Sequence, residues 1–187
     1  SAGELDADEV IWALGAEPGP TAVWRLRPWL HDGIAGSAGL PHGREILRGE
    51  KSVSGNVLII DEEGGWSAIS LAETLAARAD VAKVTVATTE VAWGEADLTF
   101  TRELSAITAR IRAAGIEVVA AAVVEEIASG SVKIRDGRKL GPFDSIVLAT
   151  GTVATEFPEG GNAVGDCLSP RGIWAATHDA AKLARTF

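Results

Sequence analysis

Acidic and glycine residues follow a short apolar run near the middle of the chain, where a phosphate-binding loop would be expected. The apolar run is residues 57–60 (VLII), the acids and glycines are residues 61–65 (DEEGG), and a helical pattern begins at about residue 67. A strand, a glycine-containing loop and a helix in this order open a dinucleotide-binding βαβ unit, whose helix N-terminus faces the pyrophosphate. The position of this loop therefore predicts nucleotide chemistry.

The residue types in the loop do not match that chemistry. A working dinucleotide loop needs three glycines, for a tight turn, for close approach of the pyrophosphate and for packing of the helix on the strand. Counted from the strand end, these positions hold Asp61, Glu63 and Trp66. Asp61, Glu62 and Glu63 would repel a diphosphate and could satisfy the helix N-terminus from within. Two interpretations stay open: a pocket closed from within and filled by Trp66, or a nucleotide bound in altered form.

The candidate cofactor-binding residues lie where predicted strands end and predicted helices begin. An acid after the second strand favours NAD and an arginine there favours NADP. Thr88 and Thr89 hold that position, Glu90 follows, and no arginine is near. NAD is therefore preferred if a nicotinamide cofactor binds. The candidates in the loop and after the second strand are Gly64, Gly65, Trp66, Ser67, Thr88 and Glu90.

No pattern of residues predicts a catalytic or metal-binding group. The chain has one cysteine, Cys167, which excludes an internal disulfide and a cysteine-based metal site and fits a reducing cytoplasm. Its three histidines, His31, His42 and His178, share no metal-ligand spacing. A turn is an alternative role for Asp166, because aspartate is common in turns.

Charge and hydropathy exclude two classes of partner. The net charge of −9 argues against nucleic acid and against an anionic membrane surface, since either needs a basic face. Apolar runs such as residues 118–124 are far shorter than a membrane span. The chain contains no methionine and begins Ser-Ala-Gly, so we expect it to be an excised piece of a longer protein.

Apolar periodicity predicts an α/β fold. Strand-like runs at residues 57–60, 83–88 and 116–119 alternate with helical patterns at residues 67–78 and 97–114. Further strands are expected at residues 8–15, 123–128, 131–135, 139–140, 145–149 and 162–166, with helices near residues 44–48 and at residues 174–185, and with a packed connection at residues 20–50. This order predicts a Rossmann-like parallel sheet with flanking helices and a β-meander.

Segments far apart in the chain resemble flavoprotein reductases of the glutathione-reductase type. Residues 8–18 (DEVIWALGAEP) and 144–152 (DSIVLATGT) resemble a pair of strands in those proteins, and residues 162–184 resemble their terminal A-x-G-D segment. Residues 39–50 and 57–76 resemble more narrowly the C-terminal region of the trimethylamine dehydrogenase and 2,4-dienoyl-CoA reductase group, which are flavin oxidoreductases related to old yellow enzyme.

The resemblance implies a domain organisation and a set of cofactors. Residues 1–50 and 151–187 would form part of an FAD-type domain, into which residues 51–150 are inserted as an NAD(P)-type Rossmann-like domain. The FMN and the 4Fe-4S cluster of the group would lie in a part of the parent protein that this chain lacks. ADP, FAD and NAD are the candidate ligands of the chain itself. The resemblance adds Gly151, Gly165 and Asp166 to the candidate cofactor-binding residues, and Gly165 and Asp166 would approach the flavin nucleotide.

Three hypotheses for the function follow. The first is a nucleotide-binding-type domain of a flavin-dependent NADH:flavin oxidoreductase, similar to an amine dehydrogenase or a dienoyl-CoA reductase, with a degenerate loop and no turnover of its own. The second is a structural and interaction module with a closed nucleotide pocket, and the third is a self-standing NAD-dependent reductase. The expected partners are an adenine nucleotide, the flavin barrel of the parent protein and a second copy of the chain.

Overall fold

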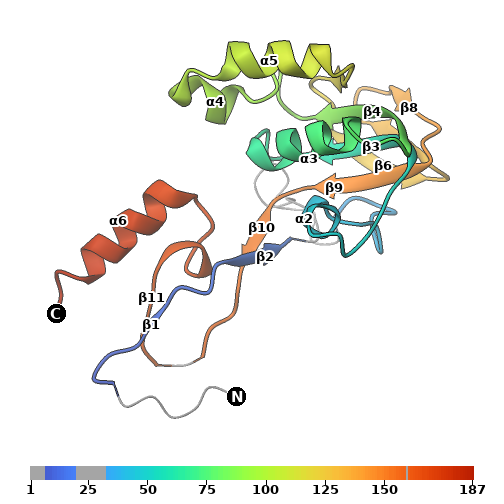
Figure 1. The fold of residues 1–187 in the computed structure, drawn as a ribbon. Coiled ribbons are helices and arrows are strands. Elements are labelled where there is room, and N and C mark those ends of the chain that lie inside the picture. The colour runs from blue at the N-terminus through green and yellow to red at the C-terminus, as the bar shows by residue number, and fades with distance from the viewer. Residues whose placement is uncertain (1–6, 20–32, 159) are drawn as a thin grey trace. The chain divides into compact units, whose positions relative to one another are not determined.

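The computed structural model describes residues 7–19, 33–158 and 160–187, which belong to two compact units (Figure 1). One unit is Pro20–Gly151, and the other combines Ser1–Gly19 with Thr152–Phe187. Of the predicted connection at residues 20–50, residues 20–32 lie outside the described part, and the rest belongs to the larger unit. The acidic loop is also in the larger unit.

A four-stranded parallel sheet forms the centre of the larger unit. Its strands are β3 (Gly55–Asp61), β4 (Val81–Thr88), β5 (Glu117–Val119) and β9 (Ser145–Ala149), in the order β5-β4-β3-β9. Asp61 is in register with Thr88 on one side and with Ala149 on the other. Parallel strands end at the same edge of a sheet, so this register brings the segments after β3, β4 and β9 together.

Both faces of the sheet are buried, because side chains alternate between them along each strand. Val57 and Ile59 contribute to the core on the helical face, whereas Leu58 and Ile60 contribute to the core on the opposite face. Helix α3 (Trp66–Ala76) packs its buried residues on the first face, as the predicted apolar stripe requires. Continuous β-branched and leucine runs thus predicted these strands correctly.

One predicted helix is two helices in the structure. Residues 97–114 were expected to be continuous, but α4 (Glu95–Thr101) ends at Arg102 and α5 (Leu104–Ala113) begins after it. Residues nine positions apart on a continuous helix point about 180° apart, yet Leu98 and Ile107 are both buried in the same core. The break, at which Arg102 has a φ of 61°, brings both side chains to the sheet.

A three-stranded antiparallel meander covers the other face of the sheet (Figure 1). It consists of β6 (Val124–Ala128), β7 (Ser131–Ile134) and β8 (Lys139–Leu140). The turn at Ser129 and Gly130 has positive φ at both residues, as a tight two-residue hairpin requires. The short helix α2 (Gly43–Leu47) lies in the position predicted for it.

The smaller unit contains two short strand pairs and a helix. Strand β1 (Ile11–Trp12) pairs in parallel with β11 (Asn162–Ala163), and β2 (Ala16–Pro18) pairs antiparallel with β10 (Thr152–Ala154). A 3-10 turn, η1 (Gly165–Cys167), precedes α6 (Ile173–Leu183). The strand predicted at residues 8–15 is therefore shorter than expected, and the β2–β10 pair was not predicted. None of the described helices is both long and apolar enough to cross a membrane.

Candidate functional site

The candidate site is the carboxyl edge of the parallel sheet, where the segments after β3 and β4 meet. Asp61 is the last residue of β3, is fully buried, and lies beside Thr88, the last residue of β4. The ladder continues past the strand ends, because the Thr89 amide donates to the Asp61 carbonyl at 3.3 Å and the Glu62 amide donates to the Ala149 carbonyl at 3.2 Å. The loop is thus held closely against the sheet.

The Asp61 carboxylate accepts the hydrogen bonds of the loop. Its Oδ1 accepts from the amides of Glu63 and Gly64, each at 3.0 Å. Its Oδ2 accepts from the indole Nε1 of Trp93 at 2.7 Å, and the Thr88 side chain is a further hydrogen-bond partner. Backbone amides of this loop are the groups that hold a phosphate in a working dinucleotide site. Here a side chain of the same loop occupies them.

The Glu90 carboxylate closes the loop from the β4 side. Its Oε2 accepts from the Gly94 amide at 2.8 Å. Gly64 has a φ of +70°, and a Cβ atom built on it would lie 2.1 Å from the Glu90 carboxyl carbon. Gly64 is therefore required both for its backbone conformation and for the close approach of Glu90. The predicted site residues Gly64, Thr88 and Glu90 do come together, around Asp61.

Burial raises the pKa of the Asp61 carboxyl, and its hydrogen bonds from Gly64, Trp93, Glu63 and Thr88 oppose that increase. Desolvation disfavours the charged form of a carboxyl, whereas donated hydrogen bonds favour it. The folded protein consequently holds a proton on Asp61 at a higher pH than the unfolded chain does. Folding is thus coupled to the protonation of the buried Asp61 carboxyl.

The remaining predicted residues of the loop lie at the start of α3. Gly65 is the N-cap, and Trp66 and Ser67 are the first two residues of the helix and are exposed. Trp66 is 38% exposed, whereas Trp93 is only 7% exposed and contacts Asp61 directly. The tryptophan that contacts the loop acid is therefore Trp93, whereas Trp66, which one interpretation of the sequence placed in the pocket, is exposed at the start of α3.

Further polar groups lie where β9 ends. Thr150 is fully buried, and its hydroxyl has no hydrogen-bond partner among the described residues. Gly151 follows with a φ of 100°. His42 accepts a hydrogen bond from the Arg44 amide on Nδ1 at 3.2 Å, so its proton is on Nε2. Burial, and then the nearby charge of Arg44, lower the pKa of His42. The imidazole is therefore neutral at physiological pH.

Gly165 and Asp166 belong to the smaller unit and form its 3-10 turn. Gly165 has a φ of +70°, and a Cβ atom on it would lie 3.2 Å from the Ala176 side chain. The Asp166 Oδ1 accepts from the Arg171 amide at 3.1 Å, which stabilises the segment before α6. Among the residues that the structure describes, no three His, Cys, Asp or Glu side chains come together as a metal site requires.

Sequence reasoning missed the residue that contacts the loop acid most closely. Trp93 is 32 positions from Asp61 in the chain, and no local pattern links the two residues. The sequence feature that could have indicated this contact is the position of Trp93 just before a helix that returns to the sheet.

Comparison with solved structures shows which proteins contain a region of this fold. The chain superposes on 6-hydroxypseudooxynicotine amine oxidase from Pseudomonas geniculata N1 with a TM-score of 0.81 and 29% identity, over 95% of this chain and 28% of that one. Histamine dehydrogenase from Rhizobium sp. 4-9 matches with a TM-score of 0.78 and 19% identity, over 94% and 30%. A 2-naphthoyl-CoA reductase matches with a TM-score of 0.70 and 20% identity, over 92% and 26%.

The resemblance to the trimethylamine dehydrogenase group is confirmed. The chain has the fold of the nucleotide-binding region of trimethylamine dehydrogenase-like flavin oxidoreductases, and it spans less than a third of the length of these three proteins. An NADPH oxidase and a flavoprotein disulfide reductase, at 16% and 15% identity, share the fold alone. No protein-family model matches the chain, and no curated protein sequence matches it significantly.

Proposed function

We propose that this chain is the nucleotide-binding-type region of a trimethylamine dehydrogenase-like flavin oxidoreductase whose dinucleotide loop is closed by its own carboxylates. In this proposal the larger unit corresponds to an NAD(P)-type domain and the smaller unit to part of an FAD-type domain. The region contributes structure and assembly to the parent enzyme, while the flavin chemistry takes place elsewhere in that enzyme. The observation that carries the proposal is the pair of hydrogen bonds from the Glu63 and Gly64 amides to Asp61.

Hydrogen bonding supports a closed loop. A phosphate entering the loop would have to displace the Asp61 carboxylate from the Glu63 and Gly64 amides. The displaced carboxylate would also lose the Trp93 indole, which is buried. Hydrogen bonds to a charged group contribute about 1.5–3 kcal/mol each, and a buried donor left without a partner costs about 1–3 kcal/mol. Opening the loop for a diphosphate therefore costs the free energy of several hydrogen bonds.

Charge acts in the same direction. Two like charges 4 Å apart repel by about 4 kcal/mol at an effective dielectric constant of 20. The N-terminus of a helix stabilises an anion by about 0.3–1 kcal/mol, and by about 2 kcal/mol in favourable cases. With Asp61 and Glu90 both at the loop, repulsion exceeds the attraction that α3 can supply to a diphosphate.

Calorimetric titration of the chain with NADH, NADPH, ADP and FAD tests the proposal. We expect no binding in the micromolar range for any of the four ligands. Micromolar binding of NADH or NADPH to the wild-type chain would overturn the closed loop. Micromolar binding of FAD or ADP alone, with the Glu63 and Gly64 amide resonances unchanged, would instead support a nucleotide site outside the loop.

Restoring the glycines gives the complementary experiment. The variant Asp61→Gly/Glu63→Gly/Trp66→Gly should bind NADH more tightly than the wild-type chain, because it removes two acids and the side chains at the fingerprint positions. Glu90→Gln is the matched single change, since it removes one charge and keeps the shape of the side chain. If the triple variant retains its circular dichroism spectrum and binds no better, our account of the loop is wrong.

A further inference from the structure

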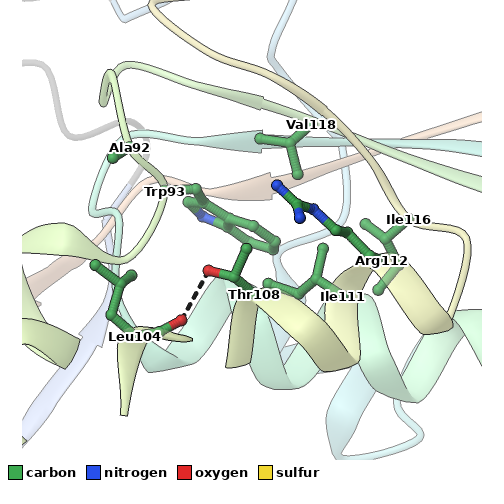
Figure 2. Close-up of a pocket in the computed structure, with 8 residues that line it drawn as sticks. All are labelled: Ala92, Trp93, Leu104, Thr108, Ile111, Arg112, Ile116 and Val118. Carbon is green, nitrogen blue, oxygen red and sulfur yellow. Dashed lines mark hydrogen bonds between the residues drawn. The ribbon is translucent and has the colours of Figure 1, made fainter. Parts of the chain in front are cut away.

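A cavity of about 360 Å³ lies between α5, the segment before α4 and the edge strand β5 (Figure 2). It shares Trp93 with the loop, because the indole of that residue donates to Asp61. Its walls are largely apolar and include Trp93, Leu104, Ile111 and Ile116. Small-molecule sites are typically about 300–1,000 Å³, apolar, and equipped with a few polar groups that orient the ligand. The cavity is thus at the small end of the range for ligand sites.

Among the side chains that the structure describes, Arg112 is the one charged group that lines the cavity. Its guanidinium extends over the cavity toward Trp93 and Val118 in Figure 2. No carboxylate among the described residues pairs with it, whereas Arg110, two positions earlier on the same helix, pairs with Glu73. An unpaired arginine beside an apolar wall, in a chain of net charge −9, provides a position for an anionic ligand.

One further polar group lines the cavity. The Thr108 hydroxyl donates to the Leu104 carbonyl at 2.7 Å, as the dashed line in Figure 2 shows. Its donor is therefore engaged, but its oxygen can still accept a hydrogen bond from a ligand. The cavity consequently offers a ligand the aromatic face of Trp93, the guanidinium of Arg112 and the hydroxyl oxygen of Thr108 as an acceptor.

We propose that this cavity binds a small aromatic carboxylate, with its ring against Trp93 and its carboxylate on Arg112. The flat guanidinium of arginine can donate two parallel hydrogen bonds to a carboxylate, which a neutral amide cannot accept in the same way. The indole ring provides a flat apolar surface against which an aromatic ring stacks favourably. The volume is suited to a one- or two-ring acid, and a single arginine does not match a diphosphate.

Titration with indole-3-acetate, followed by calorimetry and by NMR, tests the site. We expect saturable binding that shifts the Trp93 indole resonance and the methyl resonances of Ile111 and Ile116. The neutral isostere indole-3-acetamide should bind about tenfold more weakly, because it lacks the charge that pairs with Arg112.

Arg112→Gln and Arg110→Gln form a matched pair on the same helix. Arg112→Gln should weaken indole-3-acetate binding about tenfold or more and remove the preference for the acid over the amide, whereas Arg110→Gln should leave both unchanged. Thr108→Leu, which adds volume inside the cavity, should abolish binding. Because Arg112 is exposed, its variant should fold even if the Thr108 variant does not.

Two results would overturn the proposal. One is the absence of any shift at Trp93, Ile111 and Ile116 with millimolar indole-3-acetate. The other is equal affinity of the wild-type chain and Arg112→Gln for the acid, which would show that arginine does not recognise the carboxylate. Neither result depends on whether the loop at Asp61 binds a dinucleotide.

Discussion

The loop after β3 and the cavity beside α5 lie in the same unit and share one residue, Trp93, but they differ in how their polar groups are used. In the loop, the amides of Glu63 and Gly64 and the indole of Trp93 all donate to Asp61. In the cavity, Arg112 has no carboxylate partner among the described residues. The polar groups of the loop are thus paired within the protein, whereas the cation of the cavity has no partner among the described residues.

The two sites differ because Asp61 and Arg112 are held by different kinds of secondary structure. Asp61 is the last residue of β3, which is buried from Val57 onward, so its carboxylate is fixed beside the loop amides before any ligand arrives. Arg112 is on the exposed side of α5, and its long side chain reaches over apolar residues. In our proposals, the fixed position of Asp61 closes the loop to a nucleotide, and Arg112, which has no carboxylate partner among the described residues, leaves the cavity available to an anion.

Among the single substitutions considered, Asp61→Ala should lower the free energy of unfolding most. It would leave the Trp93 indole and two loop amides without an acceptor, and we expect a loss of about 2–4 kcal/mol in the free energy of unfolding. Urea denaturation measures this loss. The control is Asp80→Ala, which removes an exposed acid paired with Arg78 and should cost less than about 1 kcal/mol. Equal losses in the two variants would show that Asp61 does not organise the loop.

The two tryptophans near the loop provide the next test. Trp93→Phe removes the indole donor from a buried carboxylate and should destabilise the chain by about 1–3 kcal/mol. Trp66→Phe changes a side chain that is 38% exposed, and its effect should be within about 0.5 kcal/mol. A larger loss for Trp66→Phe than for Trp93→Phe would favour the interpretation in which Trp66 fills the pocket.

Alanine variants of two glycines with the same backbone conformation distinguish the cost of the left-handed backbone from the cost of a steric contact. Gly64 and Gly115 have φ values of +70° and +69°, but only at Gly64 does an added Cβ meet another group, the Glu90 carboxyl. Both alanine variants should lose about 1–2 kcal/mol from the left-handed backbone. Gly64→Ala should lose roughly 1 kcal/mol more, because Glu90 must leave the Gly94 amide. The same loss at both positions in thermal or urea unfolding would mean that Glu90 does not press on the loop.

The smallest expected effect is a dependence of stability on pH. Burial raises the folded-state pKa of Asp61 above its unfolded value. The folded state therefore binds more protons between those two values, and stability falls as the pH rises through that interval. Asp61→Asn has no such titration, so the difference in unfolding free energy between wild type and variant should change with pH across that interval. A constant difference would show that the Asp61 pKa is the same in both states.

The sequence predicted those features that depend on neighbouring residues. The apolar runs of β3, β4 and β9 identified the parallel sheet. Asp61 and Glu63 at the fingerprint positions predict an altered loop, and the ligand titrations test that prediction. Contacts between distant residues could not be found in this way. Trp93 reaches Asp61 only because the chain turns back after β4, and the split of α4 from α5 depends on how Leu98 and Ile107 reach one core.

The most direct test of the closed loop is amide hydrogen exchange followed by NMR. Our account predicts that the Glu63 and Gly64 amide protons and the Trp93 indole proton are protected in the wild-type chain and are unaffected by millimolar NADH. The same protons should lose their protection in Asp61→Ala. Rapid exchange of these protons in the wild-type chain, or a change in their resonances when NADH is added, would contradict the account.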